Sequence, residues 1–301
     1  MINNFNFEKN FKLANISSLF LVLASVFMIF FKGLNFGIDF KGGTLIELRC
    51  DSENIQISDV RASFNNLNLG DVNVKEFGKK GDYLIKFERK NFDEKNSIKI
   101  IKENVKNKLQ GNIDFRRVEN VGPKVSKELL ESGLLAISLA LAAMLFYIWV
   151  RFEWQFSIGS IIAIFHDVLI TIGLFSLLSL EINLSIVAAV LTIVGYSMND
   201  TVVIYDRIRE NLIKYSSLKI GEISNKSINE TLSRTVITST TTLLALISIF
   251  ILGGEILKGF SLAMIIGVII GTYSSIFVAS PILKYLNVSY KTISKEKEKN
   301  Y

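Results

Sequence analysis

Residues 156–178 read FSIGSIIAIFHDVLITIGLFSLL, a run in which His166 and Asp167 are the only ionisable side chains. An apolar run of about 18 residues or more is long enough to cross the hydrocarbon core of a membrane as a helix. Similar runs occur at 14–31, 132–150, 182–205 and 258–283. A sixth run, 235–254, is rich in threonine, which helices tolerate where they face other helices. The sequence therefore predicts an all-α membrane bundle of six transmembrane helices.

The first apolar run follows Lys9 and Lys12, as the core of a secretory signal would. The run is too long for an ordinary signal core, and Lys32-Gly-Leu-Asn35 is a poor match to the small-residue cleavage site of a signal. We therefore expect residues 14–34 to stay in the mature protein as transmembrane helix 1.

Lysine and arginine in the short loops predict the orientation, because cytoplasmic loops carry an excess of both. The basic residues on one predicted side are Lys9, Lys12, Arg151, Arg207, Arg209, Lys214, Lys219, Lys226, Arg234, Lys284, Lys291, Lys295, Lys297 and Lys299. The opposite short loops hold Lys258 beside Glu255, and Glu181 alone. Both termini are therefore predicted to be cytoplasmic, with segment 35–129 outside. Topology thus explains the net charge of +6 without nucleic-acid binding.

This pattern divides the chain into five predicted parts. They are a cytoplasmic N-terminus (1–13), transmembrane helix 1 (14–34), an outer domain (35–122), a five-helix transmembrane region (123–286) and a cytoplasmic tail (287–301). The five helices are expected at about 132–150, 156–178, 182–205, 235–254 and 258–283. The tail is rich in lysine, which is typical of a disordered segment.

The outer segment alternates between strand and helix patterns. Strands are predicted at 43–50, 71–77, 82–88 and 113–118, and helices at 57–69 and 96–109. The order β-α-β-β-α-β is that of an α+β ferredoxin-like domain. This domain holds the one cysteine, Cys50, so it has no internal disulfide and must be stabilised by its own core. Its charge is mixed, with 18 Lys and Arg against 15 Asp and Glu over 35–129, which favours a solvated surface.

Asp200 is an ionisable group inside a predicted span, and such groups are costly in hydrocarbon and usually functional. It lies six residues before Asp206, or roughly 9 Å inside the cytoplasmic end at about 1.5 Å per residue. Tyr196 and Asn199 make this stretch unusually polar. Burial disfavours a charged carboxylate and a nearby cation favours it, so Asp200 is a candidate proton-binding group. A carboxylate that only pairs or caps between helices fits equally well.

Arg234 has two interpretations. It precedes the threonine-rich run, as an ordinary cytoplasmic flank would. However, Ser227-Ile-Asn-Glu230 fits a capping box, which predicts a helix start near residue 228. Arg234 would then lie about two turns inside the helix, with its side chain able to reach a carboxylate on the preceding span.

His166 and Asp167 are near the middle of their span. Asp167 shares a helical face with Ser160, Ala163 and Thr171, so we expect it to point into the bundle. A proton relay and a hydrogen-bonded packing role are both open for the pair. The chain lacks His-Glu-x-x-His, Gly-x-Ser-x-Gly, phosphate-loop and Cys/His-cluster motifs. We therefore predict neither an enzyme nor a bound metal or organic cofactor.

Five stretches together resemble the SecF family, the smaller subunits of the SecD–SecF accessory complex of bacterial protein export. They are GIDFKGG at 37–43, VGPKV at 121–125, FHDV at 165–168, VGYSMNDTVVIYDRIRE at 194–210 and NETLSRT at 229–235. Met198 stands where many relatives carry another aliphatic residue. The resemblance covers most of the chain.

The resemblance implies a proton-driven helper of polypeptide translocation in the bacterial inner membrane. The bundle would be half of a resistance-nodulation-division transporter, and SecD would supply the other half. The implied partners are SecD, the SecYEG channel, YajC and the translocating polypeptide, and the coupling ion is the proton. In the family, proton conduction is assigned to the positions that Asp200 and Arg234 occupy here. The polar residues His166, Asp167, Tyr196 and Asn199 are our supporting candidates. The alternative is a half-transporter of this type that exports small molecules.

Overall fold

The chain forms two compact units in a computed structural model, which describes residues 5–51, 55–65, 67, 69–70, 72–76, 79–87, 94–109 and 112–293. Of residues 94–98 and 255 only the backbone is described. The bundle unit comprises 1–35, 136–180 and 185–301, and the sheet unit comprises 36–135 and 181–184. Lys295, Lys297 and Lys299, which entered the orientation argument, lie outside the described residues.

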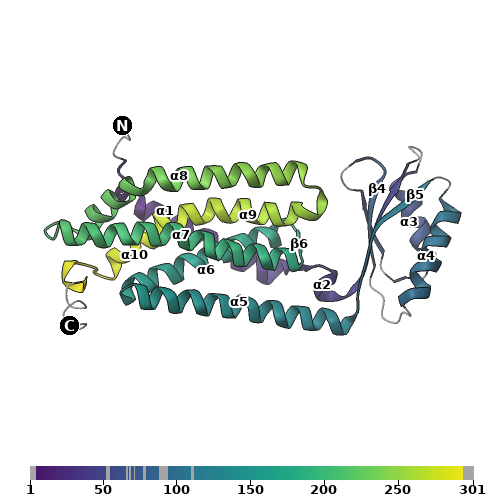
Figure 1. The fold of residues 1–301 in the computed structure, drawn as a ribbon, viewed down its shortest axis with the longest axis horizontal. Helices are drawn as coiled ribbons and strands as arrows, with labels where there is room; N and C mark the ends of the chain where they lie inside the picture. Colours follow the sequence, from purple (N-terminus) through teal and green to yellow (C-terminus); the bar gives the residue numbers. More distant parts are fainter. Residues whose placement is uncertain are drawn as a thin grey trace. The chain divides into compact units, whose positions relative to one another are not determined.

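Six helices in the described residues are long and apolar enough to cross a membrane, which confirms the predicted number. They are α1 (Phe11–Lys32, preceded by the 3-10 turn η1, Glu8–Asn10), α5 (Pro123–Arg151), α6 (Trp154–Leu177), α7 (Leu184–Lys214), α8 (Ile220–Leu252) and α9 (Glu255–Ser274). The last helix continues through the π-helical turn η2 (Ser275–Ala279) into α10 (Ser280–Tyr285) (Figure 1).

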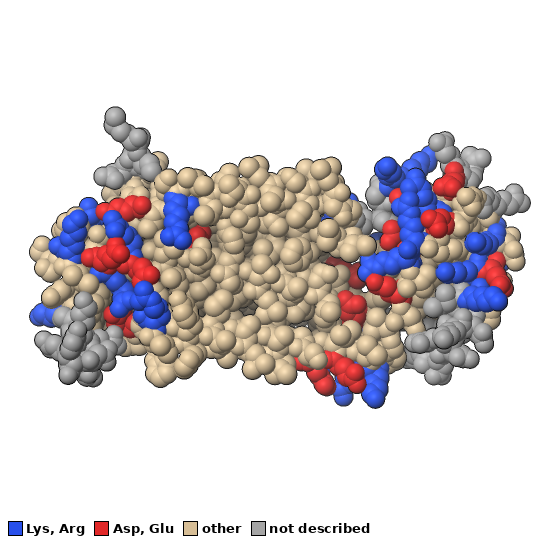
Figure 2. All heavy atoms as spheres, viewed as in Figure 1, with Lys and Arg blue, Asp and Glu red and all other residues tan. Residues whose placement is uncertain are grey.

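The bundle unit has an inner and an outer set of helices. The apolar stretches of α6, α7 and α9 with its continuation are about half buried, whereas those of α1, α5 and α8 are largely exposed within this chain. Exposed apolar faces of this kind suit contact with lipid or with another membrane helix. In the face shown in Figure 2, Lys, Arg, Asp and Glu gather at the end of the bundle unit where α7 and α8 connect, and uncharged side chains cover its middle.

The start of α8 corrects the predicted capping box. The helix begins at Ile220, so Ser227 lies inside it and accepts a hydrogen bond from the Nδ2 of Asn211 on α7 at 2.9 Å. Ile223 and Ile228 are fully buried in the bundle core. Burial of this first part of the helix outweighs the local capping signal, and Arg234 lies about four turns inside rather than two.

Both ends of the described chain pack on the bundle unit. The backbones of Phe5 and Phe7 are hydrogen-bonded to the side chains of Asn229 and Asn225 on α8. Past Asn287, Val288 and Ile293 are each 3% exposed and belong to the bundle core. The prediction of a disordered tail after Asn287 is therefore wrong for residues 288–293, because these apolar side chains find a core to enter.

The elements of the sheet unit occur in the predicted order. They are β2 (Gly43–Cys50), α3 (Ile57–Asn65), β3 (Val72–Glu76), β4 (Asp82–Phe87), α4 (Glu94–Lys108) and β5 (Ile113–Val121). The sheet order is β3-β4-β2-β5 and every neighbouring pair is antiparallel, with Ile46 opposite Ile85 and Val118. Buried side chains of α3 and α4, such as Phe64 and Val105, cover the sheet and form its core. Ile98, in the helix predicted at 96–109, is among the residues whose side chains are not described.

Residues 37–43 lie at the start of the sheet unit. They include a single helical turn, α2 (Ile38–Lys41), followed by Gly42 and Gly43 with φ of +78° and +132°. Residues that carry a side chain rarely adopt such backbone φ values, which explains why both positions are glycine. The segment 181–184, which contains the short strand β6 (Glu181–Ile182), belongs to the same unit and contacts these residues. Ile182 O accepts a hydrogen bond from Gly37 N at 2.8 Å, and Glu181 forms an ion pair with Lys86 of β4.

Candidate functional site

Asp200 is buried in α7 and incompletely hydrogen-bonded. Its side chain is 3% exposed, and its Oδ2 has no hydrogen-bond partner among the described residues. The apolar and hydroxyl-bearing face of α7 that carries it, including Ser197, Thr201 and Ile204, packs into the bundle core. Buried polar atoms are normally paired, since an unpaired one costs about 1–3 kcal/mol. Asp200 is therefore the kind of carboxyl group that needs a functional explanation.

Arg234 lies on α8, opposite this part of α7. It is close enough to Asp200 to interact with it electrostatically, yet no hydrogen bond or ion pair of its guanidinium is found among the described residues. The side chain is exposed within this chain. The structure thus brings the two predicted residues into electrostatic range and leaves them unbonded.

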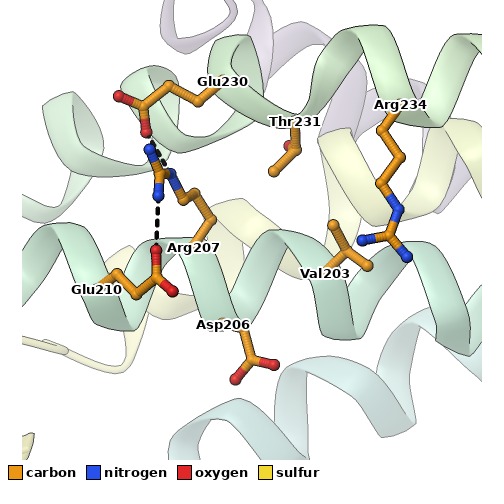
Figure 3. Close-up of a pocket in the computed structure, with 7 residues that line it drawn as sticks. All are labelled: Val203, Asp206, Arg207, Glu210, Glu230, Thr231 and Arg234. Atoms are coloured by element: carbon orange, nitrogen blue, oxygen red, sulfur yellow. Dashed lines mark hydrogen bonds and ion pairs between the residues drawn. The ribbon is translucent and has the colours of Figure 1, made fainter.

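A polar cavity of about 350 Å³, open to the surface of the chain, lies between α7 and α8 and reaches Arg234 (Figure 3). Its lining consists of Val203, Asp206, Arg207, Glu210, Glu230, Thr231 and Arg234. Arg207 bridges the two helices, with 2.6 Å from its Nε to Glu230 Oε2 and 2.6 Å from its Nη1 to Glu210 Oε2. In Figure 3, Arg234 extends from α8 toward Val203 on α7. A polar space of this size holds several water molecules.

Tyr196 and Asn199 have different surroundings. The hydroxyl of Tyr196 donates to Thr242 Oγ1 on α8 at 3.3 Å, so Tyr196 links α7 to the helix that carries Arg234. Asn199 is exposed within this chain, on a different face of α7 from the buried Asp200. One residue along a helix turns the side chain by about 100°, so Asn199 and the buried Asp200 point in different directions.

Asp167 points into the bundle, as the helical face predicted. It is 1% exposed, and its Oδ2 accepts hydrogen bonds from Ser197 Oγ on α7 at 2.5 Å and from Ser274 Oγ on α9 at 2.8 Å. Its Oδ1 lies 2.8 Å from Nδ1 of His166. His166 is 5% exposed, and its Nε2 has no partner among the described residues.

Sequence reasoning missed the two serines that hold Asp167. Ser197 was visible only as part of the polar stretch around Asp200, and Ser274 follows Gly267 and Gly271 by seven and three residues, on the same side of α9. A serine inside an apolar span, beside a glycine that allows close packing, was the available signal. No group of three or more His, Cys, Asp and Glu side chains suited to a metal ion occurs in the described part of the chain.

Two family models match the chain. Residues 100–289 match the family described as protein export membrane protein SecD/SecF, C-terminal, and residues 27–53 match the SecD/SecF GG motif. The second match covers Gly42 and Gly43 at the start of the sheet unit, and the first covers both Asp200 and Arg234.

Individual relatives agree with the family models. A protein translocase subunit SecF of Rickettsia bellii is 46% identical over 281 residues, which is 93% of this chain and 92% of the relative. A protein of the same name from Cereibacter sphaeroides is 44% identical over 280 residues, covering 90% of this chain and 86% of the relative.

The solved structures that resemble this chain are longer. The crystal structure of SecDF from Thermus thermophilus, a translocon-associated membrane protein, matches 94% of this chain at 36% identity with a TM-score of 0.83. A SecDF structure in a super-membrane-facing form matches 98% of it at 34% identity with a TM-score of 0.69. The chain spans only 38% and 40% of these two structures.

Proposed function

This chain belongs to the SecD/SecF family of protein export membrane proteins, and we propose that it works as the SecF subunit of a proton-driven SecD–SecF complex. Membership makes it a multi-pass membrane protein with a role in Sec-dependent transport. The finer proposal is that the complex uses the proton-motive force to help complete the translocation of polypeptides across the bacterial cytoplasmic membrane.

The observation that carries the proposal is the buried, incompletely bonded carboxyl group of Asp200 within range of Arg234. In an apolar setting the charged form of a carboxyl group is disfavoured, and a cation nearby favours it. Binding a proton removes the attraction between the two groups. Of two possible arrangements of the helices, the one that this attraction stabilised then becomes the less stable. One charge crossing 100 mV supplies about 2.3 kcal/mol, which is enough to shift an equilibrium between states a few kcal/mol apart.

The cavity between α7 and α8 supports a route for protons. Charged side chains line it from Arg207, Glu210 and Glu230 to Arg234. We infer that water in this cavity connects the cytoplasmic end of the two helices with the neighbourhood of Asp200.

The exposed polar side chains suggest where SecD binds. Arg234 and Asn199 are exposed within this chain, although they lie on helices that cross the membrane. A polar or charged side chain facing lipid is costly, so we propose that membrane helices of SecD cover this face. The SecYEG channel, YajC and the translocating polypeptide remain proposed partners, and purification of the native complex tests all three.

We propose the orientation that the basic loops predict, with both termini in the cytoplasm of the bacterial inner membrane. The connection between α7 and α8 and both ends of the described chain lie at one end of the bundle unit, where Lys284 forms an ion pair with Glu8 (Figure 1). The sheet unit then lies outside, and its β-α-β-β-α-β order with the sheet order β3-β4-β2-β5 supports a ferredoxin-like fold.

The decisive experiment compares Asp200→Asn with the control variant Glu222→Gln. Glu222 is an exposed carboxyl group in the first turn of α8 and does not line the cavity. In energised membrane vesicles that contain the complex, we expect Asp200→Asn to lose the gradient-dependent part of polypeptide export by roughly tenfold or more, whereas Glu222→Gln retains it. Export by Asp200→Asn at the wild-type rate refutes the proposal. Normal export with lost resistance to small toxic compounds favours the small-molecule exporter.

A further inference from the structure

Asp167 joins three helices of the bundle through one carboxylate. It lies on α6, accepts hydrogen bonds from Ser197 on α7 and Ser274 on α9, and contacts the neighbouring His166. We name these four residues the Asp167 anchor. All four are at most 5% exposed. Hydrogen bonds between helices hold their relative positions in a membrane, where water does not compete for them.

The Asp167 anchor holds α7 one turn away from Asp200. Ser197 precedes Asp200 by three residues, and residues three apart lie on the same side of a helix. The backbone of α9 comes close at this point, since a Cβ added to Gly271 would lie 2.9 Å from the Cβ of Ser197. Rotation of α7 about its axis would therefore break the hydrogen bond between Ser197 and Asp167 and move Asp200 at the same time.

A second polar contact fixes α7 on the other side of Asp200. The hydroxyl of Tyr205, which is fully buried, donates to the carbonyl oxygen of Ala279 at 2.9 Å. Ala279 ends the π-helical turn η2, and such turns interrupt the regular helical hydrogen bonds and are frequent at functional sites. The segment with Asp200 is thus held at both ends by buried polar contacts to the same helix, α9 with its continuation.

The anchor also extends toward α1. The ring of His166 stacks on Tyr273 of α9 with centroids 6.2 Å apart, and the hydroxyl of Tyr273 donates to the carbonyl oxygen of Ala14 at 2.9 Å. His166 and Tyr273 are the titratable side chains that contact the anchor carboxylate or its histidine among the described residues. Arg234 is the charged group that acts on Asp200 itself.

We propose that Asp167 is a positioning residue for Asp200. Through Ser197 it sets the rotation of α7, and so holds the carboxyl group of Asp200 at a defined place relative to Arg234. Asp167 itself need not exchange a proton in this role. The importance of that placement for export rests on the proposed function of Asp200, but the placement can be measured without export.

The test measures the proton affinity of Asp200 by its reaction with a hydrophobic carbodiimide, which attacks protonated carboxyl groups in apolar surroundings. Labelling is followed against pH in membrane vesicles that contain the complex, and mass spectrometry assigns it to the peptide with Asp200. The variants are Ser197→Ala, which removes one hydroxyl, and Asp167→Asn. The matched control is Ser261→Ala, because Ser261 is a buried serine of α9 whose hydroxyl bonds only within its own helix.

We expect Ser197→Ala and Asp167→Asn to move the midpoint of Asp200 labelling by about half a pH unit or more, and Ser261→Ala to leave it in place. A residue that only stabilised the fold would lower the amount of inserted protein and leave the midpoint unchanged, and that result overturns the proposal. If Asp167→Asn does not insert, Ser197→Ala alone decides. An altered midpoint combined with wild-type export by Asp200→Asn would refute the proposed function and leave the positioning role intact.

Discussion

Asp167 and Asp200 are two carboxyl groups that lie in the same bundle and are buried almost equally, at 1% and 3% exposure. They differ in their partners. Asp167 has two serine hydroxyls and a histidine ring around it, whereas Oδ2 of Asp200 has no partner in the described residues. Burial alone therefore does not distinguish the two carboxyl groups. They differ in the number of hydrogen bonds that each one completes.

The difference has a physical consequence for a change of charge. A group held by several hydrogen bonds loses all of them when it moves, so it stabilises one arrangement of the helices. A group with few partners loses little when it gains a proton, and a neighbouring cation then decides which charge state is favoured. This difference fits the roles proposed above, in which Asp167 positions the helices and Asp200 responds to the proton gradient.

The largest expected effect is on stability, and it tests the comparison directly. Asp167→Ala removes the acceptor from Ser197, Ser274 and His166, so we expect the free energy of unfolding in mixed micelles to fall by about 3 kcal/mol or more. Asp200→Ala removes a carboxyl group with an unpaired oxygen, and we expect it to cost less than about 1 kcal/mol. Equal costs for the two variants would show that the hydrogen-bond count does not distinguish the residues.

A smaller effect is expected where α9 packs on α7 beside the Asp167 anchor. A Cβ added to Gly267 would lie 2.3 Å from Cγ1 of Ile193, which is too close for two carbon atoms that are not bonded to each other. We expect Gly267→Ala to cost about 1–3 kcal/mol of unfolding free energy, as overpacking does.

Gly195→Ala provides the matched control for this substitution. Gly195 is also in a helix of the bundle, but the nearest atom to an added Cβ is Cε of Met144 at 3.6 Å, an ordinary contact. We expect this variant to be neutral or slightly stabilised, because alanine favours helix over glycine by about 1 kcal/mol. A loss of stability from Gly195→Ala that matches the loss from Gly267→Ala would contradict the close contact between α7 and α9.

The smallest effect concerns a third buried ionisable group, in the sheet unit. Burial, and less strongly the charge of Asp51, raises the pKa of the Cys50 thiol to about 11. The unfolded thiol, with a pKa of about 8.5, ionises first, so this group's contribution to stability is complete below about pH 8.5 and is lost as pH rises toward 11. We expect a loss of about 1–2 kcal/mol between pH 8 and pH 10 that Cys50→Ala does not show.

Thiol labelling checks the same group independently. Cys50 is the only cysteine in the chain, so a maleimide reports on it alone. At pH 8 we expect labelling of the folded protein to be on the order of 100-fold slower than labelling in denaturant, because the thiolate is the reactive form. Similar rates in the two conditions would mean that the thiol is neither buried nor held neutral.

Much of the fold could be predicted from local patterns. The six apolar runs and the strand and helix periods of residues 43–118 depend on side chains that are near one another in sequence. The same holds for Asp167, whose inward direction follows from the small residues on its helical face. The start of α8 could not be predicted in this way, since a good capping signal at Ser227 lost to the burial of Ile223 by distant parts of the chain.

By itself, the amino-acid sequence determined that this chain has six helices long and apolar enough to cross a membrane, which family it belongs to, and that Asp167, Asp200 and Arg234 are its unusual polar residues. These properties follow from hydrophobicity and order along the chain. Only the tertiary structure decided which carboxyl group is satisfied, because the hydroxyls that reach Asp167 come from residues 30 and 107 positions away. Helix packing brings such residues together, and no local pattern specifies their distance.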